Sequence, residues 1–163
     1  MRYYLQREIT QQLELAPASL HTIYSSHFLE HLDFSQANML LDQCFQAMQP
    51  GGCLRLVVPD FELWCRNYLK RSSNFFRWYH GNFLGEGWDP VQTPCTTFNG
   101  LIYGHGHQSM VDLETLSRKL RRAGFTNVSR QPWGRSRQVH NIAELEPMDS
   151  IRRHESLIVE AVK

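Results

Sequence analysis

The apolar and polar positions between residues 20 and 60 follow the pattern of a strand, a helix and a second strand. LHTIYSS (20–26) has the composition of a strand, and the residues after it place apolar side chains on one helical face: Ala37, Leu40, Leu41, Cys44, Phe45 and Met48. Asp33 or Ser35 is suited to cap the start of the helix, and the PGG turn to end it. CLRLVVPD (53–60) reads as the next strand. Short connections of this kind predict a βαβ unit with parallel strands.

Further elements follow in the second part of the chain. FELWCRNYLK (61–70) is amphipathic and predicts a helix. A second helix is predicted after Asp112, which is suited to cap it, and Gly124 is suited to end it. TNVSRQPW (126–133) and ESLIVEAVK (155–163) predict two closing strands.

The chain has the length of a single domain, which we expect to span 1–163. RYYLQREIT (2–10) predicts a short strand. Two segments without clear periodicity, 71–110 and 134–150, are expected as long loops or insertions. The first is rich in aromatic residues and suits a lid, a contact with a second chain or a small satellite core.

Composition and charge narrow the function classes. The chain is 42% hydrophobic and 20% charged, with a formal net charge of +1, so no global field favours nucleic acid or an anionic membrane. No apolar stretch approaches the length of a membrane span, and the start of the chain has no apolar signal core. The four cysteines form no C-x-x-C pair, which favours reduced thiols and a cytoplasmic protein.

One short motif suggests metal chemistry. HFLEHL contains His27-x-x-Glu30-His31, the inverted zinc-protease pattern, in which two histidines of one helix hold a metal. Here a strand leads into the motif and a helix starts only after it. A metal-dependent hydrolase is therefore kept only as a remote alternative.

Three longer matches resemble class I S-adenosylmethionine-dependent methyltransferases of the type 11/12-like group. They are TIYSSHFLEHL, AMQPGGCLRLVVPD, and DLETLSRKLRRAGFTNV with the closing SLIVEAVK. The resemblance implies an α/β, Rossmann-like class I methyltransferase sheet, mostly parallel with an antiparallel final strand. It covers the later strands of that fold, so the sheet is expected to be truncated at the N-terminus.

The sequence has no counterpart of the segment with which the family binds its cofactor. No G-x-G-x-G occurs, and the glycines lie from Gly51 onward, so the loop that brings backbone close to the cofactor has no counterpart. The absence of the first strand would leave an unpaired edge at 20–26, which native proteins cover. We therefore expect a homodimer, or a second chain that covers this edge.

The resemblance also implies site residues. Ser25, Ser26 and His27 end a strand at positions that contact the methionine part of the cofactor, S-adenosylmethionine, in the family. Asp60 stands at the carboxyl end of the next strand, where open α/β sheets place residues that face a ligand, and is a further candidate for cofactor binding. Asp60 has an alternative role as the cap of the helix at 61–70. Methyl transfer needs no fixed nucleophile, and His27 or His105 is the candidate for a base.

The same strand end resembles a second group, the plant small-RNA 2′-O-methyltransferases, which hold a divalent ion there. That resemblance implies a metal set of His27, Glu30, His31 and His107. The preferred interpretation is a capping and packing pair, Glu30 and His31, without a metal.

The sequence thus predicts a methyltransferase-like protein that depends on S-adenosylmethionine if it is active, with an unknown substrate. The alternative is a non-catalytic, degenerate methyltransferase-like domain for binding or dimerisation. The two differ in whether the cofactor binds.

Overall fold

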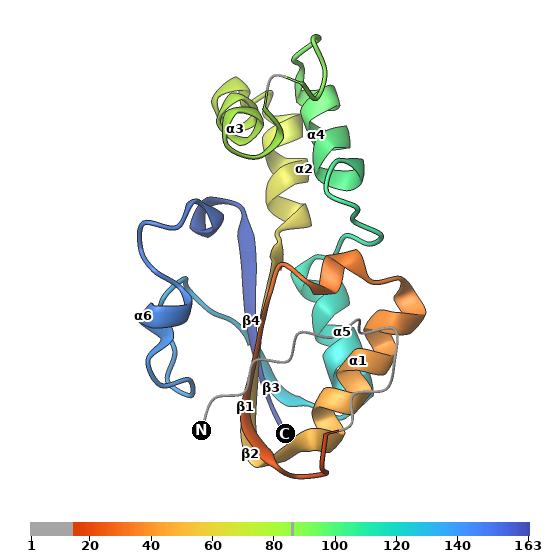
Figure 1. Cartoon of the computed structure of the whole chain (residues 1–163), viewed down its shortest axis with the longest axis vertical. Coiled ribbons are helices and arrows are strands. Elements are labelled where there is room, and N and C mark those ends of the chain that lie inside the picture. The colour runs from red at the N-terminus through yellow and green to blue at the C-terminus, as the bar shows by residue number, and fades with distance from the viewer. Residues whose placement is uncertain (1–14, 86) are drawn as a thin grey trace.

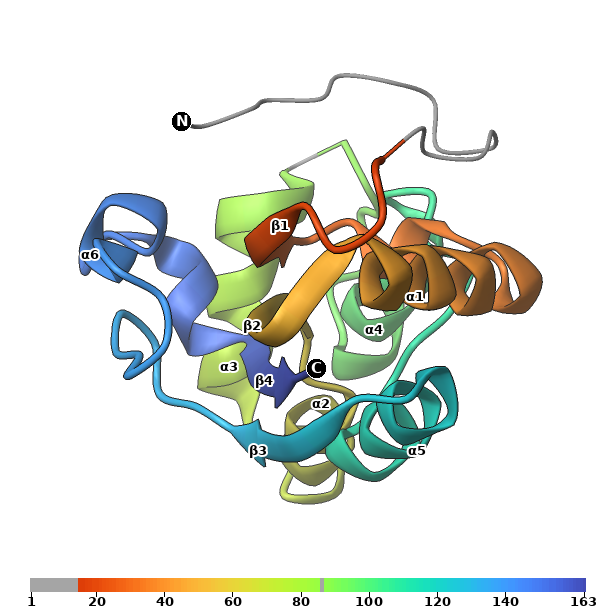
Figure 2. The same ribbon diagram turned by 90° about the horizontal axis from the view of Figure 1, so that it is seen from below.

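The computed structural model describes residues 15–85 and 87–163, in which a mixed four-stranded sheet forms the centre. The predicted strand at 2–10 lies outside the described residues. The strand order is β1-β2-β4-β3 (Figure 2), and the strands are β1 (Leu20–Ser26), β2 (Met48–Pro59), β3 (Thr126–Arg130) and β4 (Ser156–Val162). β1 and β2 are parallel, and β4 runs antiparallel to both of its neighbours. β1, β2 and β3 therefore point the same way and only the final strand is reversed, as predicted.

Helices surround this sheet on three sides (Figure 1). The helical elements are η1 (Leu29–His31), α1 (Phe34–Ala47), α2 (Phe61–Leu69), α3 (Ser73–Tyr79), η2 (His80–Leu84), α4 (Pro94–Tyr103), α5 (Leu113–Ala123), α6 (Ile142–Leu145) and η3 (Ile151–His154). α1 and α5 cover one face of the sheet, whereas α6 lies on the other side. α2, α3 and α4 stand beyond the end of the sheet at which β1 and β2 finish.

The helix α1 begins as predicted and ends earlier than predicted. Asp33 caps it by accepting from the backbone of Gln36, whose side chain accepts from Asp33 in return. The expected end at the PGG turn is wrong, because the helix stops at Ala47 and Met48 is already extended. Met48 pairs with Leu20 of β1, so its backbone belongs to the sheet while its side chain stays in the core.

The main core lies between the sheet and the helices α1 and α5. Its buried residues include Leu41 of α1, Leu56 of β2 and Leu120 of α5. Leu116 and Leu120 repeat at helical spacing, Asp112 caps α5 by accepting from Thr115, and Gly124 closes the helix in the left-handed conformation. The amphipathic pattern of the late helix therefore identifies the side that packs.

The segment 71–110, expected as a long loop or insertion, contains α3, η2 and α4. Together with α2 these elements form a second apolar cluster around Trp64, which is fully buried. The Trp64 ring stacks on Phe98 at 5.5 Å between centroids and meets Tyr79 edge-on at 4.4 Å. The satellite core, one of the three interpretations of this segment, is thus present. Its aromatic contacts join residues of different helices. The periodicity of any one segment therefore could not predict them.

The other side of the sheet carries a buried ionic network. Arg55 of β2 is fully buried and donates two hydrogen bonds of 2.6 Å to Glu146 and one of 2.7 Å to Glu160. Glu146 lies in the segment 134–150, which the sequence predicted as a loop and which contains α6. Because a buried charge is costly without partners, this network ties the segment to the sheet.

Within residues 15–85 and 87–163, no helix combines the length and the hydropathy needed to cross a membrane.

Candidate functional site

Charged residues gather where β1 and β2 finish and β4 starts. His27 follows β1, Asp60 follows β2 and Glu155 precedes β4. Their backbones are joined across the sheet end, since His27 N–H donates to the Val57 carbonyl at 2.8 Å and Asp60 N–H donates to the Glu155 carbonyl at 2.9 Å. This is the edge at which open α/β sheets bind ligands.

His27 is held in a strained conformation by several contacts. Its φ is +49°, a left-handed value that is uncommon for residues other than glycine. Arg152 donates to Nδ1 at 3.1 Å, so Nε2 carries the proton and donates to Ser156 Oγ at 2.9 Å. Nε2 also lies 3.5 Å from a Glu155 carboxylate oxygen. Both ring nitrogens are therefore engaged by the protein.

Glu155 forms the buried acidic part of this edge. Its side chain is fully buried, and burial raises the pKa of its carboxyl, while His27 and Arg152 oppose the rise. The Arg152 guanidinium is 3.2 Å away. Sequence reasoning missed Glu155 and Arg152, because a carboxylate before a final strand and an arginine in a polar loop carry no local signal of burial.

A second group of ligating side chains lies beside His27. Glu30, His31 and His107 bring one potential ligand atom each to within 4.8 Å of one another. The His31 and His107 rings have centroids 4.7 Å apart, and the His105 ring lies 5.6 Å from His107. We call Glu30, His31, His105 and His107 the His–Glu cluster. The structure thus brings together three of the four residues in the predicted metal set. His27 contacts Glu30 at 3.2 Å but lies outside the three-ligand group.

Backbone hydrogen bonds place the two halves of the His–Glu cluster side by side. The carbonyl of Glu30 accepts from the backbone N–H groups of Gln108 and Ser109, at 2.8 and 3.1 Å. The Gln108 side chain donates to the carbonyl of His31 at 2.9 Å. These bonds fasten the loop that carries His107 onto η1, although the two segments are far apart in sequence.

Several polar atoms of the His–Glu cluster are buried without a hydrogen-bond partner. They are both carboxylate oxygens of Glu30, Nε2 of His105 and Nδ1 of His107. Burial lowers the pKa of His107 to about 4, with Glu30 opposing, and burial also lowers the pKa of His105. Both rings are therefore neutral at neutral pH.

The H-x-x-E-H motif does not form the helix that a zinc protease of that class needs. Glu30 and His31 lie in the short 3₁₀ helix η1, and His27 precedes it with its left-handed backbone. The two histidines are therefore not stacked on one α-helical face. The placement between a strand and a capped helix agrees with the sequence-based interpretation.

Asp60 has its two carboxylate oxygens occupied. Oδ1 accepts from the backbone N–H of Leu63 at 3.1 Å, which caps α2, and Oδ2 accepts from Arg130 at 2.6 Å. The predicted capping role is confirmed. Of the other residues predicted at the cofactor site, Ser26 is exposed at the end of β1 and Ser25 is half-buried.

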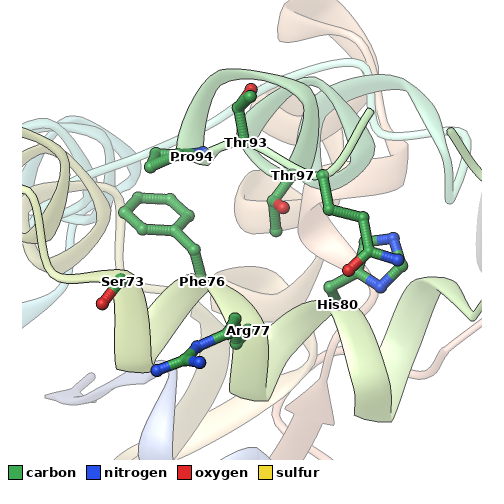
Figure 3. Close-up of a pocket in the computed structure, with 8 residues that line it drawn as sticks. Ser73, Phe76, Arg77, His80, Thr93, Pro94 and Thr97 are labelled. Carbon is green, nitrogen blue, oxygen red and sulfur yellow. The ribbon is translucent and has the colours of Figure 1, made fainter. Parts of the chain in front are cut away.

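A separate pocket of about 260 Å³ lies within the helical part of the molecule, between α3–η2 and the start of α4 (Figure 3). His80 is 5% exposed, and its Nε2 has no hydrogen-bond partner. No residue of the His–Glu cluster lines this pocket. Its lining residues are Ser73, Phe76, Arg77, His80, Gln92, Thr93, Pro94 and Thr97.

The sequence matches no family model and no curated protein. Solved structures do match. A SAM-dependent methyltransferase from Archaeoglobus fulgidus is 18% identical with a TM-score of 0.55, over 98% of this chain and 66% of that one. A SAM-dependent methyltransferase from Thermotoga maritima, described as a possible histamine N-methyltransferase, is 16% identical with a TM-score of 0.55, over 99% of this chain and 64% of that one. This chain thus spans about two thirds of their lengths.

A third match is a complex between the Haloferax volcanii methyltransferase activator Trm112 and a protein described as a candidate methyltransferase. It is 12% identical with a TM-score of 0.51, over 97% of this chain and 60% of that one. Identities this low establish the fold. The strand order, the strand directions and these neighbours together show that the chain has the α/β, Rossmann-like fold of class I S-adenosylmethionine-dependent methyltransferases.

Proposed function

We propose that this chain forms part of an S-adenosylmethionine-dependent methyltransferase site, the part under the methionine end of the cofactor. The observation that carries the proposal is the fold: the chain superposes on a SAM-dependent methyltransferase with a TM-score of 0.55 over 98% of its length. The ligand-binding edge of the sheet holds a group of buried charged residues. Ligands of open α/β sheets bind at this edge.

The proposed cofactor contacts are Ser25, Ser26, the backbone of His27 and Asp60, whose carboxylate caps α2 and pairs with Arg130. Methyl transfer from a sulfonium is a displacement in which positioning provides much of the acceleration. The occupied nitrogens of His27 favour His105 as the base, because Nε2 of His105 has no partner.

The family's G-x-G-x-G pattern does not occur in the 163 residues, so the proposed site binds the cofactor without that loop or is completed by a second chain. In the described part of the chain, β1 pairs with β2 on one side and has no strand on the other. We propose that a second polypeptide, in the first instance another copy of this chain, covers that edge. The Haloferax volcanii structure supports the idea of a partner chain, since it contains a methyltransferase with its activator.

Calorimetric titration with S-adenosylhomocysteine tests the proposal. We expect binding at micromolar strength, and we expect Ser26→Trp to abolish it by filling the carboxyl edge of β1. Thr22→Trp is the matched control, because Thr22 is also exposed on β1 but lies toward the other end of the strand. No heat at millimolar ligand, or equal loss in both variants, contradicts the proposal. The first result favours the non-catalytic binding domain.

A further inference from the structure

The Glu30 carboxylate of the His–Glu cluster is buried without hydrogen bonds that would offset the cost of its burial. The side chain of Glu30 is 1% exposed, and neither oxygen accepts a hydrogen bond. A buried carboxylate without hydrogen bonds is among the most costly groups in a protein interior. The nearest cationic candidate is His27, at 3.2 Å, but its Nδ1 already accepts from Arg152.

Two imidazoles from different segments each bring a ring nitrogen to within 4.8 Å of this carboxylate. His31 follows Glu30 directly, and His107 comes from the loop that the Glu30 carbonyl anchors. Nδ1 of His107 is buried and has no partner. A carboxylate and two imidazoles with ligand atoms within 4.8 Å of one another, and with buried unpaired polar atoms on Glu30 and His107, are what a bound cation would satisfy.

We propose that Glu30, His31 and His107 bind one divalent transition-metal ion. One carboxylate and two imidazoles suit Zn²⁺, Mn²⁺ or Fe²⁺, whereas Mg²⁺ prefers oxygen ligands alone. Three protein ligands leave coordination positions for water or for a ligand oxygen. This inference does not rest on the proposed methyltransferase function.

The structure assigns different roles to the remaining histidines of this edge. His105, whose ring centroid lies 5.6 Å from that of His107, adjoins the site but is not one of the three ligands, so its unpaired Nε2 stays available as a base. His27 is not a ligand, because its two nitrogens are held by Arg152 and Ser156. It lies beside the site, with Nδ1 3.2 Å from a Glu30 carboxylate oxygen.

Direct metal measurement tests the site. Protein purified without a nickel column is stripped with EDTA, dialysed and titrated with ZnCl₂ against a chromophoric chelator, and Co²⁺ is added separately for its visible absorption. We expect one equivalent per chain and at least about tenfold weaker binding in His107→Ala. His140→Ala, which removes an exposed histidine after β3, is the control and is expected to bind normally.

Thermal unfolding of Glu30→Gln separates metal binding from simple packing. Without metal, this isosteric variant is expected to melt at or above the wild-type temperature, since an amide costs less to bury than an unpaired carboxylate. With ZnCl₂, only the wild type is expected to gain stability. Sub-stoichiometric binding that His107→Ala leaves unchanged overturns the proposal. So does a metal-free Glu30→Gln that melts well below a wild type insensitive to zinc.

Discussion

At the end of the sheet, the partners of each buried carboxylate determine what that residue contributes. Asp60 and Glu155 are both buried carboxylates, yet their surroundings differ. Asp60 has a helix N-terminus and an arginine as partners, whereas Glu155 relies on Arg152 and His27. The sequence showed that Asp60 precedes a helix, so its cap was predictable. It gave no indication of Arg130 as a partner, which comes from a distant strand.

At Asp60 we expect the cap to matter more than the ion pair. Asp60→Ala removes the acceptor for the Leu63 N–H and is expected to lower the free energy of unfolding by about 1–2 kcal/mol. Asp60→Asn keeps an acceptor and is expected to cost less, because Arg130 is half-exposed and its ion pair is partly screened. Urea unfolding of both variants measures the difference. Equal losses would show that the charge, and not the cap, stabilises this end of α2.

Whole elements are fixed by how they end as well as by what they bury. α5 ends at Gly124, whose φ is +108°, and α5 packs against α1. A Cβ at Gly124 would lie 2.7 Å from Phe45 Cζ, so this residue must be small as well as left-handed. Its position after the apolar face predicted the left-handed helix end, and only the packing against Phe45 reveals that the residue must also be small.

Substitution of two glycines separates these requirements. Gly124→Ala adds both backbone strain and a clash with Phe45, and we expect it to destabilise the fold by about 2–4 kcal/mol. Gly51→Ala is the matched control: its φ is +78°, but a Cβ there meets no atom within 4 Å. It is expected to cost only about 1 kcal/mol. Chemical denaturation tests this, and similar losses in the two variants would remove the packing argument.

The whole molecule presents an incomplete sheet in its described part. β2 is paired on both sides, while β1 is paired on one. In most α/β folds a parallel strand such as β1 has a neighbouring strand on each side, because the N–H and C=O groups along both of its edges need hydrogen-bond partners. The proposed second chain would supply them.

Light scattering coupled to chromatography tests the proposed association. We expect the mass of two chains at micromolar concentration, because pairing of two β1 edges or of a β1 edge with another segment satisfies backbone groups that water otherwise must. A dilution series is the control for weak, concentration-driven contacts. The mass of a single chain throughout the series contradicts the homodimer.

The sequence by itself determined the order of the four described strands and of α1, α2 and α5, the caps of α1 and α5, and the faces that pack on the sheet. These follow from local periodicity and from residues that satisfy helix ends, which depend only on near neighbours. The motif around Glu30 was also visible, together with His107.

Tertiary structure alone decided which of those residues meet. It left His27 in contact with Glu30 but outside the group formed by Glu30, His31 and His107. It also gave the aromatic segment a second core around Trp64 and buried Arg55 between two glutamates. Each outcome depends on contacts between segments distant in sequence. Such contacts depend on how the chain folds and on which side chains become buried together. They therefore produce no periodic pattern of apolar residues in the segments that make them.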